Sequence, residues 1–219
     1  IYGTQLAQPF TDHPFWIGSV FIIDPLYTLP LLVGLIGTGI ARGPNRLRWN
    51  TAGVALSTAY LGWSMLAQAW VTDIAERNLA AQGIAAERML VTPTPFNTLL
   101  WRVLVMDADG SSYHEGFYAL ADRGRPIRFR RFSTDAALHR ELADEWPVAR
   151  MTWFSHGFYR MREDAGRALI ADLRMGQQDG YVFEFVVARR GSGWRAAPIE
   201  SVGERGDARA GLAWIWRRL

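Results

Sequence analysis

Asp24 is the ionisable residue with the strongest claim to a chemical role, because it stands inside a long apolar run. The run is FWIGSVFIIDPLYTLPLLVGLIGTGIA, residues 15–41. A carboxylate beside such a run is costly to keep and usually has a partner, which favours a functional site. Pro25 disfavours helical geometry at Asp24, so the carboxylate can equally cap a helix that begins near Leu26. The sequence leaves both interpretations open.

His156 is a second candidate for chemistry. It follows the aromatic residues Trp153 and Phe154 and precedes Gly157. A histidine in this setting could transfer protons, but spacing alone assigns no serine, histidine and acid triad. The chain has no cysteine, which excludes disulfides, thiolate metal sites and cysteine nucleophiles.

Asp172 and Arg174 are two residues apart near the end of a predicted strand. Their side chains therefore share a face, where an ion pair is the expected arrangement. Asp12 and His13, in TDHPF, are expected in a surface loop. The turn DADGSS contains two aspartates, but it lacks the later ligands of a calcium loop and predicts a hairpin instead.

The composition divides the 219 residues into two unequal parts. Apolar runs fill the first seventy residues, and nearly all arginines and acids follow Asp73. The net charge of +3 comes from arginines interleaved with acids, so no nucleic-acid partner is expected. One dense basic run, RPIRFRRF, holds Arg125, Arg128, Arg130 and Arg131, and we interpret it as the solvated face of a strand.

The elements that must position these residues begin with two apolar segments. The segment 51–71 has no charge and, as a helix, would extend roughly 30 Å, and the other helix is expected over about 26–41. Arg42, Arg46 and Arg48 lie between them and favour a cytoplasmic loop. These features predict an α+β membrane protein, with a transmembrane helical hairpin followed by an antiparallel β-rich soluble domain. We expect a multi-pass membrane region over 1–82 in a bacterial inner membrane, and a periplasmic domain over 83–219.

The second part carries β signals. Asp73–Gln82 is expected to extend the second helix, and Thr134 or Asp135 to cap a short helix through Leu142. Predicted strands form one antiparallel sheet of six or seven, and the aromatic, basic end 212–219 docks on it or lies at a bilayer surface. These strands are expected within 96–107, 113–120, 127–132, 148–154, 167–175, 181–190 and 193–199.

Four segments together resemble one family: YGTQLAQPF, FIIDPLYTLPLL, VTPTPFNTLLWR, and DLRMG followed by YVFEF. They are similar to the YdjM-like, LexA-regulated bacterial membrane-bound metal-dependent hydrolases, and the likeness extends over nearly the whole chain. In that family the supposed metal ligands are histidines and aspartates of the N-terminal membrane part. Since this sequence begins at Ile1, we expect a truncated N-terminus that held most ligands of a divalent metal ion.

The resemblance implies a metal site in which Asp24 is a ligand or base, with Asp12 and His13 as further ligands. A bound metal would activate water for hydrolysis of an ester or phosphoester, with a lipid-linked substrate as one expected kind. Tetrahedral zinc needs about four ligands, so this chain alone is expected to be inactive. The resemblance also makes Asn97 and Arg102 candidates for a conserved surface.

The alternative is a non-enzymatic, membrane-anchored binding or scaffold protein of the cell envelope. It accounts for a β-rich part that lacks a compact set of histidines and acids. Both hypotheses make the lipid bilayer a partner. The sequence specifies neither the metal nor the oligomeric state.

Overall fold

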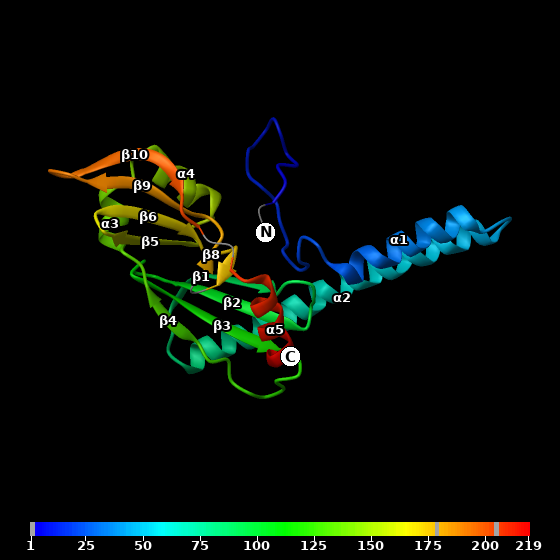
Figure 1. Ribbon diagram of the computed structural model, residues 1–219. Coiled ribbons are helices and arrows are strands. Elements are labelled where there is room, and N and C mark those ends of the chain that lie inside the picture. The colour runs from blue at the N-terminus through cyan, green and yellow to red at the C-terminus, as the bar shows by residue number, and fades with distance from the viewer. Residues whose placement is uncertain (1–2, 178–179, 204–205) are drawn as a thin grey trace.

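The computed structural model describes residues 3–177, 180–203 and 206–219. It has two antiparallel β-sheets at one end and a helical hairpin that projects away from them at the other (Figure 1). Ile1 and Tyr2, which open the family-like Tyr-Gly-Thr segment, lie outside the described residues.

The hairpin consists of α1, Pro25–Ile40, and α2, Asn45–Ala81. Pro25 occupies the first turn of α1, where a missing amide hydrogen costs nothing, and Asp24 caps the helix by accepting a hydrogen bond from the Leu26 amide. Glycines bring the two helices together. A methyl group on Gly53 would lie 2.5 Å from the Pro30 carbonyl oxygen, and one on Gly34 would lie 2.9 Å from the Trp49 carbonyl oxygen. Only glycine therefore permits this approach of the backbones.

The expected transmembrane hairpin is wrong. No helix in the described ranges is both long and apolar enough to cross a bilayer. α1 begins only after Asp24 and has 16 residues, or about 24 Å, whereas a hydrocarbon core is about 30 Å thick. α2 has 37 residues, but serine, threonine and glutamine interrupt its apolar part. The two-pass topology and the periplasmic placement that followed from it have no support from these helices.

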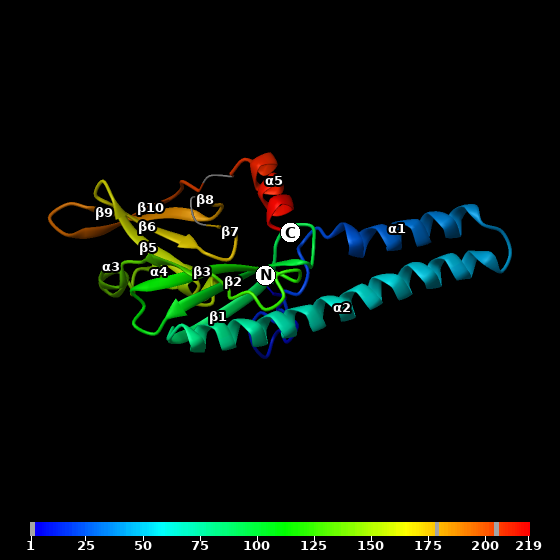
Figure 2. The same ribbon diagram turned by 90° about the horizontal axis from the view of Figure 1, so that it is seen from below.

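The first sheet has the strand order β1-β2-β3-β4, all antiparallel. Gly110, with φ of 64°, supports the tight β2–β3 turn that DADGSS predicts. The C-terminal half of α2 covers one face of this sheet, as Figure 2 shows from below. Val71, Ala75 and Leu79 of α2 pack there against Trp101 and Val103. The strands are β1, Ala86–Pro93; β2, Leu100–Asp107; β3, Ser112–Ala119; and β4, Arg130–Ser133.

The second sheet has the order β10-β9-β6-β5 and is also antiparallel. Its core includes Leu138 and Val148 from two short helices, α3, Ala136–Glu141, and α4, Trp146–Phe154. The strands are β5, Tyr159–Asp164; β6, Arg167–Asp172; β9, Glu184–Arg190; and β10, Trp194–Ser201, with the short pair β7, Gly176–Gln177, and β8, Gly180–Tyr181.

Two details of the predicted β region are wrong. The strands form two four-stranded sheets and a small pair instead of one sheet of six or seven. The segment 148–154 belongs to helix α4, because Pro147 occupies the first turn and fixes a helical φ. The helix capped by Asp135 is confirmed, since its carboxylate accepts from the Leu138 amide at 2.8 Å.

The C-terminal helix α5, Ala208–Arg218, docks on the first sheet, which confirms one of the two expected placements. Ile215 packs against Leu100 and Ala119, and the Trp214 ring lies 4.7 Å from that of Phe117.

Candidate functional site

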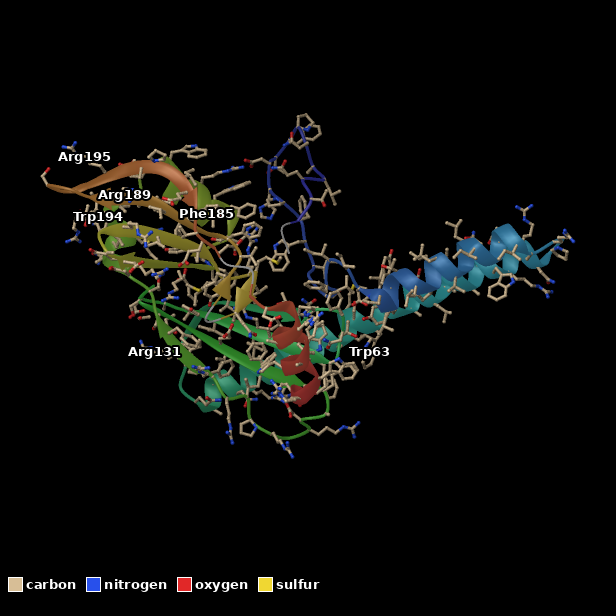
Figure 3. The ribbon with its side chains drawn as sticks, in the orientation of Figure 1. Trp63, Arg131, Phe185, Arg189, Trp194 and Arg195 are labelled. Atoms are coloured by element: carbon tan, nitrogen blue, oxygen red, sulfur yellow. The ribbon has the colours of Figure 1, made fainter. Side chains whose placement is uncertain are left out.

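The predicted site residue Asp24 lies at the base of the hairpin, next to the first sheet. Its second carboxylate oxygen accepts a hydrogen bond from the Tyr60 hydroxyl at 2.9 Å, while the first accepts from the Leu26 amide. The Trp63 indole donates to the Thr98 hydroxyl at 3.2 Å, which connects α2 to the loop before β2. Figure 3 shows Trp63 where the hairpin leaves the sheets.

This environment favours a protonated Tyr60 and a structural Asp24. The pKa of Tyr60 is raised to about 12, chiefly by burial and also by the hydrogen bond to Asp24 and the charge of Asp24, while a hydrogen bond with Thr98 opposes this rise. The phenol therefore stays a hydrogen-bond donor at neutral pH. Both oxygens of the buried Asp24 have protein partners, so Asp24 caps α1 in this structure, and its role as a metal ligand or base stays a prediction.

The N-terminal segment is held against the same junction by polar side chains of α2. Ser64 donates to the Ser19 hydroxyl at 3.0 Å. Gln68 donates to two backbone carbonyls, that of Ile17 and that of Val91 in β1. One glutamine amide therefore connects the N-terminal segment, α2 and the first sheet.

Asn97, the first candidate implied by the resemblance, shapes the TPTPFN loop. Its side-chain oxygen accepts from the amides of Leu99 and Leu100 at 2.9 and 2.8 Å, and its nitrogen donates to the Thr94 hydroxyl. The loop presents Phe96, which has a positive φ of 66° and lies 5.4 Å from the Phe21 ring. Asn97 thus fixes an exposed aromatic side chain beside the hairpin base.

Arg102, the second such candidate, is buried between the two sheets. Its guanidinium donates to Glu115 at 2.7 Å and to the Leu173 carbonyl, just beyond β6, at 2.6 Å. The Tyr113 and Tyr181 hydroxyls lie 2.9 Å apart in the same layer. These hydrogen bonds link the two sheets. Arg102 is buried and does not form part of an exposed surface.

Asp172 and Arg174 form the predicted ion pair, fully buried, with a shortest N–O distance of 2.7 Å. Arg174 also donates to the Phe154 carbonyl at the end of α4. The pair therefore holds α4 against the end of β6.

His156 lies close to this pair, in a strained conformation with φ of 54°. Its ring is 6.2 Å from both the His13 ring and the Trp16 ring. Burial, the positive charge of Arg174 and His13 lower the pKa of His156, while Asp172 opposes them. Its buried Nε2 has no hydrogen-bond partner among the described residues. An acid–base role for His156 stays a prediction.

The expected metal ligands do not form a site in the described part of the chain. No three histidines, aspartates or glutamates there are grouped so that they could hold a metal ion. His13 lies against Phe15 and His156, and the Asp24 oxygens are engaged as described above. The roles of Asp12, His13 and Asp24 as ligands of a divalent metal ion therefore stay a prediction.

The hairpin exposes an apolar surface along both of its helices. Its outward side chains are mainly leucine, isoleucine and valine, while its contact face holds Gly34 and Gly53. This arrangement is the reverse of a helix pair packed in water, where the large apolar residues face inward. In the sequence, the small residues spaced along 53–62 indicate this close contact between the helices.

Searches of curated proteins and of solved structures give no significant match to this chain. A comparison with protein families does give a significant match, which covers the N-terminal segment, α1 and the first part of α2. The match ends at Val71, before VTPTPFNTLLWR, so it does not extend over nearly the whole chain as the resemblance suggested. It supports association with a bacterial inner membrane. The resemblance is thus confirmed over residues 1–71, which match the family described as YdjM inner membrane protein.

Proposed function

We propose that this protein is a membrane-associated binding protein, in which the outer surface of the α1–α2 hairpin contacts lipid acyl chains and the sheets bind a ligand. The reversed packing of the hairpin is the observation that supports this proposal. Small residues at a helix contact with large apolar residues outside are typical of helices in lipid, where close backbone packing replaces hydrophobic burial.

The exposed side chains determine how much free energy the hairpin would gain by contacting lipid. Leu35 and Ile36 on α1 are 65% and 59% exposed, and Leu66 on α2 is 70% exposed. Burying a whole leucine or isoleucine side chain contributes about 1.5–3 kcal/mol. Burying the exposed part of each of these side chains would therefore contribute roughly 1–2 kcal/mol. An acyl-chain environment would supply that contribution along both helices.

Arginines at the turn of the hairpin suit contact with a membrane surface. The turn and the start of α2 hold Arg42, Arg46 and Arg48, which can pair with lipid phosphates.

Vesicle flotation of the whole protein tests the proposal. Leu35→Glu combined with Ile36→Glu removes two outward apolar contacts, together about 2–4 kcal/mol, so partitioning onto phosphatidylcholine–phosphatidylglycerol vesicles should fall roughly 30- to 700-fold. Ile199→Glu is the matched control, because Ile199 is similarly exposed but lies on β10. Equal partitioning of all three proteins would refute a lipid-contacting hairpin.

A second candidate function, metal-dependent hydrolysis of an ester or phosphoester, follows from the family resemblance. The buried Asp24 beside the Tyr60 hydroxyl is the feature that favours it. Metal analysis of the purified protein beside Asp24→Asn separates the two functions. Stoichiometric metal that the substitution removes would support the hydrolase, and a folded protein without metal would count against it.

A further inference from the structure

Two cavities adjoin the loop 121–128 at the edge of the first sheet. The larger lies between this loop and the middle of α2, has a volume of about 600 Å³ and is lined by Trp70, Arg77, Tyr118, Arg123 and Arg125, among others. The smaller, of about 400 Å³, lies between the loop and α5, shares Arg125 with the larger and is also lined by Asp122, Arg128 and Arg218. Together they form one groove, here called the arginine groove, that none of the site residues discussed above enters.

The loop that forms one wall of the groove is held in place along its length. The Ile127 amide donates to the Asn78 side chain at 2.9 Å, and Gln82 donates to the Ile127 carbonyl at 3.0 Å. At the other end the Arg125 amide donates to the Asp122 carbonyl at 2.8 Å, and Gly124 takes a φ of 75°. α2 therefore fixes the backbone from which the arginines project.

The arginines of this wall carry charge that nearby acids do not neutralise. Within the described ranges, Arg123, Arg125 and Arg128 have no carboxylate oxygen within 4 Å. The nearest acid in the loop, Asp122, is taken up by Arg218 of α5 at 2.6 Å. Arg77, across the groove, is shared with Asp73. The groove is therefore a positively charged hollow with fixed walls.

We propose that the arginine groove binds a phosphate-bearing ligand, with Arg123 and Arg125 as its principal contacts. Guanidinium groups bind phosphate oxygens through paired, charge-assisted hydrogen bonds, and a doubly or triply charged anion matches several arginines better than a single carboxylate does. Trp70, which is 44% exposed, offers an apolar or stacking surface for the rest of the ligand. The phosphate can belong to a lipid headgroup or to a soluble compound.

This site does not depend on the hairpin contacting lipid, since its walls come from α2 beyond Trp70 and from the sheet. The test is calorimetric titration of the whole protein with pyrophosphate, inorganic phosphate and monomeric dioctanoyl phosphatidic acid. Arg123→Gln combined with Arg125→Gln should raise the Kd of the bound phosphate compound about tenfold or more. Both side chains are exposed, so the variant should fold, which its melting temperature checks.

Arg189→Gln combined with Arg195→Gln is the matched control. It removes the same charge from β9 and β10 of the second sheet, where Figure 3 shows Arg189 and Arg195, whereas the groove adjoins the first sheet. Loss of binding in the groove variant but not in the control supports the site. Equal loss in both, or no binding of any of the three compounds, overturns it. Tighter binding of phosphatidic acid than of the two inorganic ions would assign the phosphate to a lipid, and the reverse to a soluble compound.

Discussion

Gly53 stands at the contact between α1 and α2, and its replacement by alanine is the most direct perturbation of the hairpin. The new methyl group would lie 2.5 Å from the Pro30 carbonyl oxygen, about 0.9 Å short of the 3.4 Å at which ordinary contact begins. It would also lie 3.0 Å from the Gly34 Cα. Both neighbours are backbone atoms, so the clash can be relieved only by separating the helices.

Two effects determine how much the substitution changes the free energy of unfolding. Overpacking of this kind typically costs about 1–3 kcal/mol. Alanine in place of a helical glycine contributes roughly 1 kcal/mol in the opposite direction. Gly62→Ala isolates the second effect, the gain in helix propensity, because Gly62 lies in the same helix and a methyl group there meets nothing within 4 Å. The two variants should therefore differ by about 1–3 kcal/mol, with Gly62→Ala more stable than the parent protein.

Hydrogen exchange measured by mass spectrometry reads the local opening of α1 and α2 directly. We expect faster amide exchange across both helices in Gly53→Ala, and unchanged or slower exchange in Gly62→Ala. Strands β5 and β6, which belong to the second sheet, serve as an internal reference. Equal protection of the hairpin in both variants would show that Gly53 is not at a tight helix contact, and the reversed packing would be refuted.

Three further predictions concern the sheets. Asn97→Ala leaves the Leu99 and Leu100 amides without their acceptor and should cost about 1–3 kcal/mol in urea unfolding, whereas Asn97→Asp, which keeps an acceptor, should cost less. Asp172→Asn leaves the buried Arg174 charge uncompensated and should cost about 3–5 kcal/mol; a loss below about 1 kcal/mol would contradict the pairing. His156 has a lowered pKa, so its neutral form stabilises the fold above the unfolded value of about 6.5, and this contribution is lost as the pH falls. The melting temperature should accordingly drop between pH 8 and pH 5, and drop less in His156→Asn.

Local features were predictable because a few neighbouring residues determine them. Asp24 followed by Pro25 predicted a helix start, and Asp109-Gly110 predicted the hairpin between β2 and β3. The Asp172–Arg174 pair followed from their spacing alone. In each case the interaction partners lie within a few residues of one another, so no knowledge of the tertiary fold is needed.

Features that depend on distant residues were not predictable in this way. The aromatic and β-branched residues of 148–154 suggested a strand, but Pro147 and packing on the second sheet make a helix. The interpretation of RPIRFRRF as a strand face holds for Arg130 and Arg131, which lie in β4. Arg125 lies outside that strand and faces the groove, which exists only because α2, about fifty residues earlier in the chain, forms its other wall.

The same helix serves both ends of the molecule. α2 runs without a proline for 37 residues, or about 55 Å, from the turn of the hairpin to the edge of the first sheet. Its first half packs on α1, and its second half carries Trp70 and Arg77 of the arginine groove. A ligand held by Trp70 and Arg77 would therefore contact the same unbroken helix that forms the contact with α1.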